Sequence, residues 1–214
     1  MKVQSRKQPY DPPVIAVVDD DPSVRAGLRN LLRSVGYEVC DYSSSREFLL
    51  SADRHGINCL ILDVRMPVAG GFDLQLELAN SRVKVPIIFM TGHADVPMSV
   101  RAMKGGAVDF LAKPFREQDM LDAVNAAVKA DLVRRDNVEE TAENAERFAG
   151  LTAREREVMS MATAGKMNKQ IAFDLGLSEI TVKIHRGKVM RKMQARTFAD
   201  LVRLAEELGL HNPR

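Results

Sequence analysis

The stretch VIAVVDD, residues 14–20, is a run of five apolar residues that ends in two carboxylates. Similar runs recur downstream, where CLILD (59–63) ends in a third carboxylate and VDFLA (108–112) is followed by Lys113. Short apolar runs bounded by polar residues are typical of buried strands. In a chain that alternates strands and helices, the carboxyl ends of parallel strands meet at one crevice. We therefore expect these charged residues to lie close together.

The first part of the chain repeats a strand and helix pattern five times. Strands are expected at 14–18, 37–42, 59–63, 85–90 and 108–111. Helices are expected at 22–35, 45–52, 71–79, 96–104 and from 117 onward. Continuous apolar runs such as CLILD and PIIFM indicate strands that are covered on both faces. The sequence therefore predicts an α/β domain over 14–130, with a five-stranded parallel sheet between helices.

Beyond residue 130 the pattern changes. The helix that starts near 117 continues without Gly or Pro to about 149, but its apolar spacing fades in RRDNVEETAENAERF. We interpret 131–149 as a long, charged and solvated helical linker. Residues 1–13 are polar and Pro-rich, and we expect them to form a flexible arm.

A second, smaller domain is expected over 150–214, after Gly150 ends the linker helix. It is all-α, with four helices at 152–164, 168–175, 179–193 and 197–208. Each helix starts at a residue whose side chain can accept a hydrogen bond from the first turn. The expected N-caps are Thr152, Asn168, Ser178 and Thr197.

Composition indicates a globular protein. The chain has 214 residues, of which 45% are hydrophobic, enough for the cores of one or two domains. No apolar stretch approaches the roughly 18 residues that span a bilayer, and the amino terminus lacks the apolar segment of a secretion signal. We therefore expect a cytoplasmic protein with no membrane partner.

The net charge of +2 is unevenly distributed along the chain. Lys and Arg against Asp and Glu number 16 and 16 in residues 1–130, 3 and 6 in 131–148, and 12 and 7 in 149–214. A basic final third is typical of a module that binds a polyanion.

Asp19, Asp20 and Asp63 are the three carboxylates expected at the carboxyl edge of the sheet. Carboxylates that converge there would repel one another. A divalent cation relieves that repulsion, and carboxylate oxygens suit Mg²⁺, which keeps several waters and takes one or two carboxylates. The adjacent Asp21, directly before Pro22, is instead expected to cap a helix.

Four motifs, VVDDD, LDVRMPVAGGFDL, FMTGH and VDFLAKPF, occur in an order and spacing that resemble the receiver domain of two-component response regulators. That family has a doubly wound, flavodoxin-like fold. The resemblance implies that Asp63 accepts a phosphoryl group. It also implies that Asp20 and Asp63 ligate Mg²⁺, with the backbone carbonyl of Arg65 as a third ligand and Asp19 acting largely through water.

The same resemblance gives roles to residues of the last two strands. Lys113 would pair with phosphoryl oxygens, and a cis bond to Pro114 would fix its direction. Thr91 and Phe110 match the switch pair, in which the hydroxyl moves to the phosphoryl group and the ring turns inward. The helix at 96–104 and the strand at 108–111 would then form the readout face.

Other uses of an aspartate nucleophile are disfavoured by the sequence. Haloacid-dehalogenase-type phosphatases place a second Asp two residues after the nucleophile, where this chain has Arg65. The P-loop pattern GxxxxGK[ST] is absent. A receiver that has lost phosphorylation is also disfavoured, because every expected acidic and basic position is filled.

The string from LTARE to TVKIHR, within residues 150 to about 205, resembles the four-helix LuxR-type helix-turn-helix of the NarL/FixJ regulators. By that resemblance, the positions of base contacts are Lys183, Ile184 and Gly187, and Gly187 departs from the long side chain often found there. Residues that suit phosphates are Asn168, Lys169, Thr181, Arg186 and Lys188, and Arg191 joins the groove-facing set. The core residues of this helix are expected to be Val182, Val189, Met190 and Met193.

The two resemblances imply a DNA-binding response regulator that is not an enzyme. A histidine kinase would phosphorylate Asp63, and phosphorylation would promote homodimerisation, through residues 96–111, and binding to double-stranded promoter DNA. The resemblance favours an activator of transcription over a repressor. The alternative is an adaptor that is switched by phosphorylation and acts through protein partners without reading DNA independently.

Overall fold

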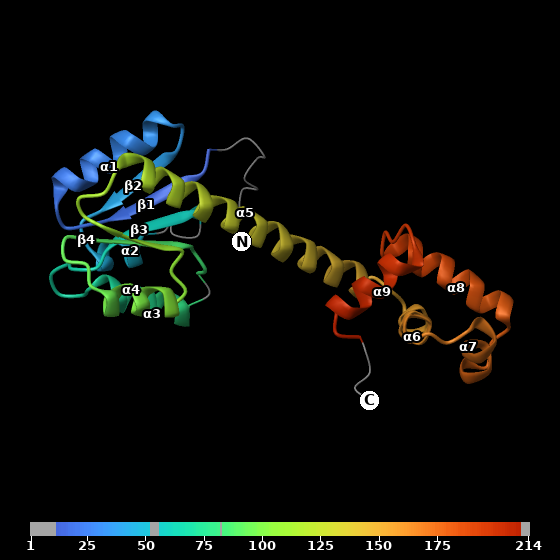
Figure 1. Ribbon diagram of the computed structural model, residues 1–214. Helices are drawn as coiled ribbons and strands as arrows, with labels where there is room; N and C mark the ends of the chain where they lie inside the picture. The colour runs from blue at the N-terminus through green and yellow to red at the C-terminus, as the bar shows by residue number, and fades with distance from the viewer. Residues whose placement is uncertain (1–11, 52–55, 82, 211–214) are drawn as a thin grey trace. The chain divides into compact units, whose positions relative to one another are not determined.

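The computed structural model describes residues 12–51, 56–81 and 83–210, so most of the arm expected at 1–13 lies outside the described residues (Figure 1). The chain divides into two compact units, Met1–Arg134 and Arg135–Arg214. The helix α5 (Glu117–Ala149) is uninterrupted and contributes residues to both units.

The first unit is built on five parallel strands in the order β2-β1-β3-β4-β5, which confirms the doubly wound sheet. The strands are β1 (Val14–Val18), β2 (Glu38–Tyr42), β3 (Cys59–Asp63), β4 (Ile87–Thr91) and β5 (Asp109–Ala112). The strand expected at 85–90 begins only at Ile87. The residue before it, Pro86, has no amide hydrogen to donate to a neighbouring strand.

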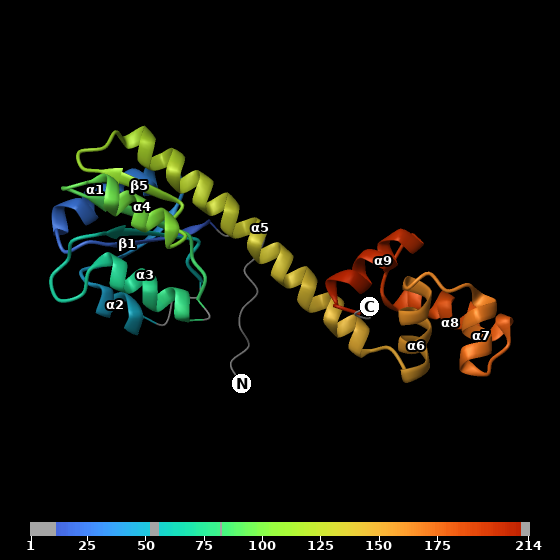
Figure 2. The same cartoon turned by 60° about the horizontal axis from the view of Figure 1, so that its bottom comes forward.

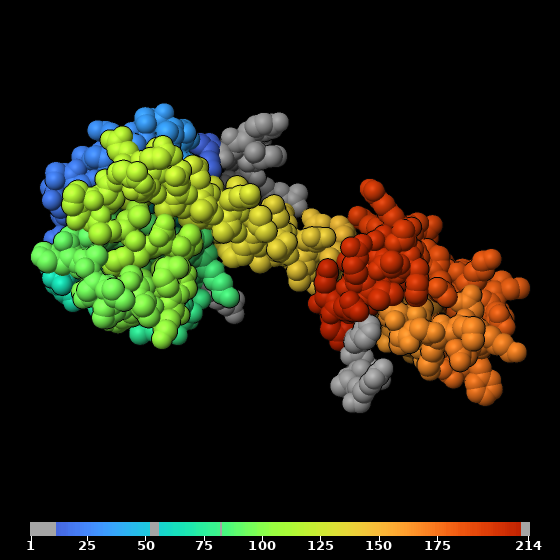
Figure 3. Space-filling view, in the orientation of Figure 1, coloured from blue at the N-terminus to red at the C-terminus, as the bar shows by residue number. Residues whose placement is uncertain are grey.

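Helices cover both faces of this sheet (Figures 1 and 2). They are α1 (Pro22–Ser34), α2 (Ser45–Leu50), α3 (Gly71–Asn80), α4 (Val96–Lys104) and the first part of α5. Leu32 of α1 and Met120 of α5 pack against one face, whereas Phe48 of α2 and Leu74 of α3 pack against the other. The strands are therefore enclosed on both faces, and α4 and α5 make up much of the surface of this unit seen in Figure 3.

The start of α1 shows why the chain turns directly after β1. Asp21 is the N-cap, as expected, and its side chain accepts a hydrogen bond of 2.8 Å from the amide of Ser23. Pro22 occupies the first turn, where backbone amides have no partner within the helix, so its missing amide hydrogen costs no hydrogen bond. The carboxylate of Asp21 is thus directed into the helix.

Most of the segment 131–149 is exposed and helical, as expected for a solvated linker, but one residue near each end is buried. Asp131 is fully buried in the first unit, where it accepts a hydrogen bond of 3.0 Å from the amide of Asn58. Asn144 is buried in the second unit, and Phe148 packs against the core of that unit. The contacts near the two ends of the segment are therefore made by polar side chains and by Phe148.

The second unit holds α6 (Ala153–Thr163), α7 (Asn168–Leu175), α8 (Glu179–Lys192) and α9 (Phe198–Glu207), as expected (Figure 2). Thr152, Ser178 and Thr197 cap their helices through side-chain oxygens. Asn168 is not an N-cap, contrary to the prediction. The cap position of α7 is Met167, whose amide donates a hydrogen bond of 2.8 Å to the side chain of Gln170.

Candidate functional site

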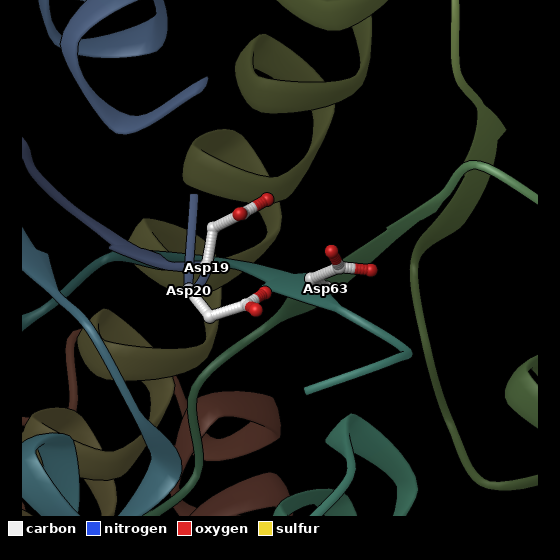
Figure 4. A group of neighbouring side chains, drawn as sticks. All are labelled: Asp19, Asp20 and Asp63. Carbon is white, nitrogen blue, oxygen red and sulfur yellow. The ribbon is translucent and has the colours of Figure 1, made fainter. Parts of the chain in front are cut away.

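Three carboxylates meet where β1 and β3 end (Figure 4). These strands are neighbours in the sheet, so the residues at their carboxyl ends come side by side. Asp19, Asp20 and Asp63 each offer one oxygen such that the three atoms lie within 4.8 Å of one another. Asp19 is fully buried, Asp63 is 8% exposed and Asp20 is exposed. The structure thus brings together the carboxylates that the sequence placed at one edge.

Lys113, which follows β5, supplies a positive charge to this cluster. Its Nζ lies 2.7 Å from Oδ2 of Asp19 and 3.1 Å from Oδ2 of Asp63. The backbone amide of Lys113 donates a hydrogen bond of 2.7 Å to the carbonyl of Thr91, and the peptide bond to Pro114 is cis, as expected. The ammonium is therefore shared between two of the three carboxylates.

Burial and hydrogen bonds have opposite effects on the pKa values of Asp19 and Lys113. Burial raises the pKa of Asp19, although hydrogen bonds from Lys113 and from the amide of Asp21 partly offset the effect. Burial alone would lower the pKa of Lys113, but its hydrogen bonds to Asp19 and Asp63 outweigh that effect and raise the pKa. Lys113 therefore remains protonated, which keeps it available to bind anionic oxygens.

The loop after β3 is packed closely against the backbone of Asp63. A Cβ at Gly71 would lie 2.4 Å from the carbonyl oxygen of Asp63, so only glycine fits there. The amide of Arg65 donates a hydrogen bond of 3.1 Å to Oδ1 of Asp63. Val68, farther along the loop, is fully exposed and has a φ of 73°. That conformation is rare for a β-branched residue.

The two expected switch residues lie on β4 and β5. Thr91 is fully buried, and its hydroxyl accepts a hydrogen bond of 3.3 Å from the amide of His93. Phe110 is partly buried, with its ring 6.5 Å from that of Phe89. The ring of Phe89 lies 5.0 Å from that of Phe72.

This row of three rings ends at a cation on α4. The guanidinium of Arg101 lies 4.3 Å from the centre of the Phe72 ring. The row therefore joins β5, β4, α3 and α4 through side chains.

One supporting residue was missed by sequence reasoning. Arg25 of α1 donates hydrogen bonds of 2.7 Å to the carbonyl of Asp19 and 3.1 Å to the carbonyl of Asp20. Its Nε lies 3.5 Å from a carboxylate oxygen of Asp41 on β2. An Arg one turn into a helix that follows the acidic pair is a weak signal, because most such residues are solvated. Here it holds the backbone that carries the acidic side chains.

The residues expected to contact DNA lie on α7 and α8 of the second unit. The exposed ones are Lys169, Lys183, Ile184, Gly187, Lys188 and Arg191, whereas Asn168, Thr181 and Arg186 are partly buried. Arg186 donates a hydrogen bond of 2.7 Å to the side chain of Asn168 and lies 4.8 Å from the centre of the Phe198 ring. Arg186 and Asn168 therefore engage each other.

Two known families match the two units. Residues 15–125 match the family described as "Response regulator receiver domain", and residues 149–205 match "Bacterial regulatory proteins, luxR family". Among the described residues, no helix is both long and apolar enough to cross a membrane.

Several proteins are similar to the chain over most of its length. Nodulation protein W of Bradyrhizobium diazoefficiens is 54% identical, over 92% of this chain and 87% of its own. Transcriptional regulatory protein FixJ of Azorhizobium caulinodans is 41% identical, over 92% of this chain and 93% of its own. The solved structure of the response regulator StyR is 46% identical, with a TM-score of 0.82 over 92% of this chain and 100% of its own. The chain therefore belongs to the response regulators that join a receiver domain to a luxR-type DNA-binding domain, and it is a DNA-binding regulator of transcription rather than an enzyme.

Proposed function

We propose that this regulator is switched by magnesium-dependent phosphorylation of Asp63, and that the phosphorylated protein dimerises and binds promoter DNA, most simply as an activator. A histidine kinase is the phosphodonor, and the cytoplasm is the compartment. The observation that carries the proposal is the ammonium of Lys113, 3.1 Å from the carboxylate of Asp63 within an acidic cluster. The domains are proposed as a receiver at 14–130, a linker at 131–149 and a DNA-binding domain at 150–214.

The donor atoms of the cluster fit a magnesium ion. Carboxylates of Asp20 and Asp63 would hold it, together with the backbone carbonyl of Arg65, while Asp19 would act largely through water. All of these donors are oxygens, which suit Mg²⁺ better than they suit metals that prefer nitrogen or sulfur. When bound, the ion would neutralise the carboxylates and the oxygens of the incoming phosphoryl group.

The chain's own residues position the nucleophile and its product. A carboxylate oxygen of Asp63 attacks phosphorus, the bond from phosphorus to the donor's histidine nitrogen breaks, and that nitrogen takes the electron pair. Lys113 already bonds Asp63, so its ammonium needs only a small movement to bind a phosphoryl oxygen. The hydroxyl oxygen of Thr91 accepts only a weak bond of 3.3 Å from the amide of His93, so it can move at little cost and donate its own hydrogen to a phosphoryl oxygen. Phe110 then turns inward behind it.

Dimerisation is proposed to use α4 and β5. Val96, Val100 and Met103 of α4 are exposed by 74%, 44% and 50%. A contiguous apolar surface of this kind is typical of a protein interface. The helix α4 packs against β5, the strand that carries Phe110 of the proposed switch pair.

The phosphoacceptor is tested by mass spectrometry of the full chain with acetyl phosphate and Mg²⁺. We expect a single phosphate adduct on the wild type and on Asp21→Asn, and none on Asp63→Asn. An adduct on Asp63→Asn would show that another residue is the acceptor. A sizing column run on phosphorylated and unphosphorylated samples would detect the expected dimer.

The adaptor alternative is tested by DNA binding. Selection from random duplexes, with and without acetyl phosphate, should recover a preferred sequence, more strongly from the phosphorylated protein. If neither state selects a sequence, the regulator acts through protein partners and does not read DNA by itself.

A further inference from the structure

The outward face of α8 is apolar in its amino-terminal half. Val182 and Val189 are 0% and 1% exposed and pack into the cores of the second unit. The opposite face carries Ile180, which is 74% exposed, and Ile184, which is 53% exposed. Both faces of this helix therefore hold branched aliphatic side chains, although only one of them is packed within the unit.

Four residues form the midline of this outward face: Ile180, Ile184, Gly187 and Arg191. Their spacings of four, three and four residues keep them in one row along a helix of 3.6 residues per turn. At Gly187 an added Cβ would meet no atom within 4 Å, so the row is open at that point. Only Arg191, at the end of the row, carries a hydrogen-bonding side chain.

The surroundings of this row indicate a nucleic-acid partner rather than an apolar protein. Lys183 and Lys188 flank the two isoleucines and are exposed, and Arg191 continues the row. The second unit is also the basic part of the chain, with 12 Lys and Arg against 7 Asp and Glu in residues 149–214. A narrow apolar stripe between ammonium groups matches a DNA major groove, where apolar methyl groups lie between two phosphate backbones.

We propose that Ile180 and Ile184 recognise the 5-methyl groups of thymines in the major groove, so that this regulator prefers T at the base pairs beneath the amino-terminal half of α8. The inference rests on the DNA binding proposed above. Aliphatic side chains have no donor or acceptor for base edges, and the thymine methyl group is the apolar feature that the major groove offers them. The gap at Gly187 lets the helix backbone come close enough for the two isoleucines to reach these methyl groups.

Arg186 takes no part in this recognition. Its guanidinium is bound to Asn168 and stacked on Phe198, which directs it along the surface of the unit. Arg186 and Asn168 therefore orient α8 against its neighbours, and base discrimination is left to the row on the outward face.

The test replaces thymine by uracil, which removes only the methyl group. Duplexes selected by the phosphorylated full chain are synthesised with deoxyuridine at one thymine at a time, and affinities are measured by fluorescence anisotropy at fixed salt. We expect a loss of about fourfold per contacted methyl group, equivalent to about 0.8 kcal/mol. Ile180→Ala and Ile184→Ala should bind the thymine duplex more weakly and lose the difference between thymine and uracil at their own positions.

Phe173→Ala is the matched control, because Phe173 is an apolar residue of the same unit that is 88% exposed but lies on α7. It should keep the full ratio of thymine to uracil affinity. Circular dichroism should show that all three variants fold, since each changes an exposed side chain.

The outcomes separate this inference from the proposal on which it rests. If no duplex is selected in either phosphorylation state, the proposed DNA reading itself fails. If a duplex is selected but uracil binds as well as thymine at every position, DNA reading stands and the methyl recognition is overturned. Loss of self-association in the isoleucine variants, with an unchanged thymine preference, would also overturn it and assign the row to a protein interface.

Discussion

Replacement of Asp20 by Asn should stabilise the first unit in the absence of Mg²⁺. Carboxylate oxygens of Asp20, Asp19 and Asp63 lie within 4.8 Å of one another. Two unit charges at that separation repel by about 0.9 kcal/mol in water and by about 3.5 kcal/mol at an effective dielectric constant of about 20. Asp20 is exposed, and Lys113 offsets part of the repulsion, so the lower figure applies. We expect a gain of about 1 kcal/mol in the free energy of unfolding.

The same substitution should abolish stabilisation by Mg²⁺. In the wild type, an ion that binds only the folded protein adds about 2.7 kcal/mol when its concentration is one hundred times its dissociation constant. Thermal unfolding in EDTA and in a magnesium series measures both effects, because about 1 kcal/mol shifts the midpoint of a unit of this size by roughly 3–5 °C.

Asp21→Asn is the matched control for Asp20→Asn. It removes a neighbouring carboxylate but keeps a good N-cap, so the magnesium shift should remain. If Asp20→Asn unfolds at or below the wild-type temperature in EDTA and still responds to Mg²⁺, the electrostatic account of the cluster is refuted.

Three further substitutions test other features. Gly71→Ala should lower the unfolding midpoint of the first unit by several degrees and slow phosphorylation, because the new Cβ would lie 2.4 Å from the carbonyl of Asp63, an overpacking that costs about 1–3 kcal/mol. Thermal unfolding and phosphate incorporation measure the two effects. Val68→Gly should stabilise the same unit by about 1 kcal/mol, measured by urea unfolding, because it relieves a left-handed conformation at an exposed residue. Glu155→Gln should cost the second unit about 1–2 kcal/mol at neutral pH, because Lys192 loses the carboxylate 2.7 Å away. Hydrogen bonds from Lys192 and from the amide of Thr152 lower the pKa of Glu155 to about 2, so the wild-type advantage is complete above about pH 4.5 and is lost as the pH falls toward 2. Urea unfolding at pH 6 and pH 3 measures this change.

The substitutions at Gly71 and Glu155 each have a control in the chain. Gly27→Ala places a Cβ in open space within α1 and should stabilise by about 0.5–1 kcal/mol. Glu157→Gln removes only an exposed ion pair and should change stability by less than about 0.5 kcal/mol at either pH. Equal unfolding midpoints for Gly71→Ala and the wild type would contradict the close approach of residue 71 to the carbonyl oxygen of Asp63. A loss of stability in Val68→Gly, or matching pH profiles for the two glutamate variants, would contradict the other two arguments.

The alternation of strands and helices was predictable because a strand that is buried on both faces has a continuous apolar sequence. CLILD and IIFMT are apolar along nearly their whole length, and both are central strands. Asp21 was predictable as a cap because its partner, the amide of Ser23, lies two residues away. The prediction of the N-cap of α7 was wrong, because an uncommon local hydrogen bond decides where that helix begins. At α7 the side chain of Gln170 bonds back to Met167, and this displaced Asn168 from the cap.

Features that depend on approach in three dimensions were not predictable. The sequence placed Lys113 at the site, but not its sharing between Asp19 and Asp63, which depends on the strand order. Arg25 gives no distinct signal, because its partners are backbone carbonyls that every residue has. The burial of Asn144 arises from packing against α9, including a hydrogen bond of 3.3 Å to Glu207, 63 residues away.

The row of rings from Phe110 through Phe89 to Phe72 has a mechanical consequence. Neighbouring rings in contact cannot turn independently, so rotation of Phe110 obliges Phe89 either to follow it or to leave a void, and voids in a close-packed interior are costly. At the far end, the guanidinium of Arg101 lies over the face of the Phe72 ring. Rotation of Phe110 on the edge strand β5 would thus reach a positive charge on the surface of α4, where a partner molecule would meet it.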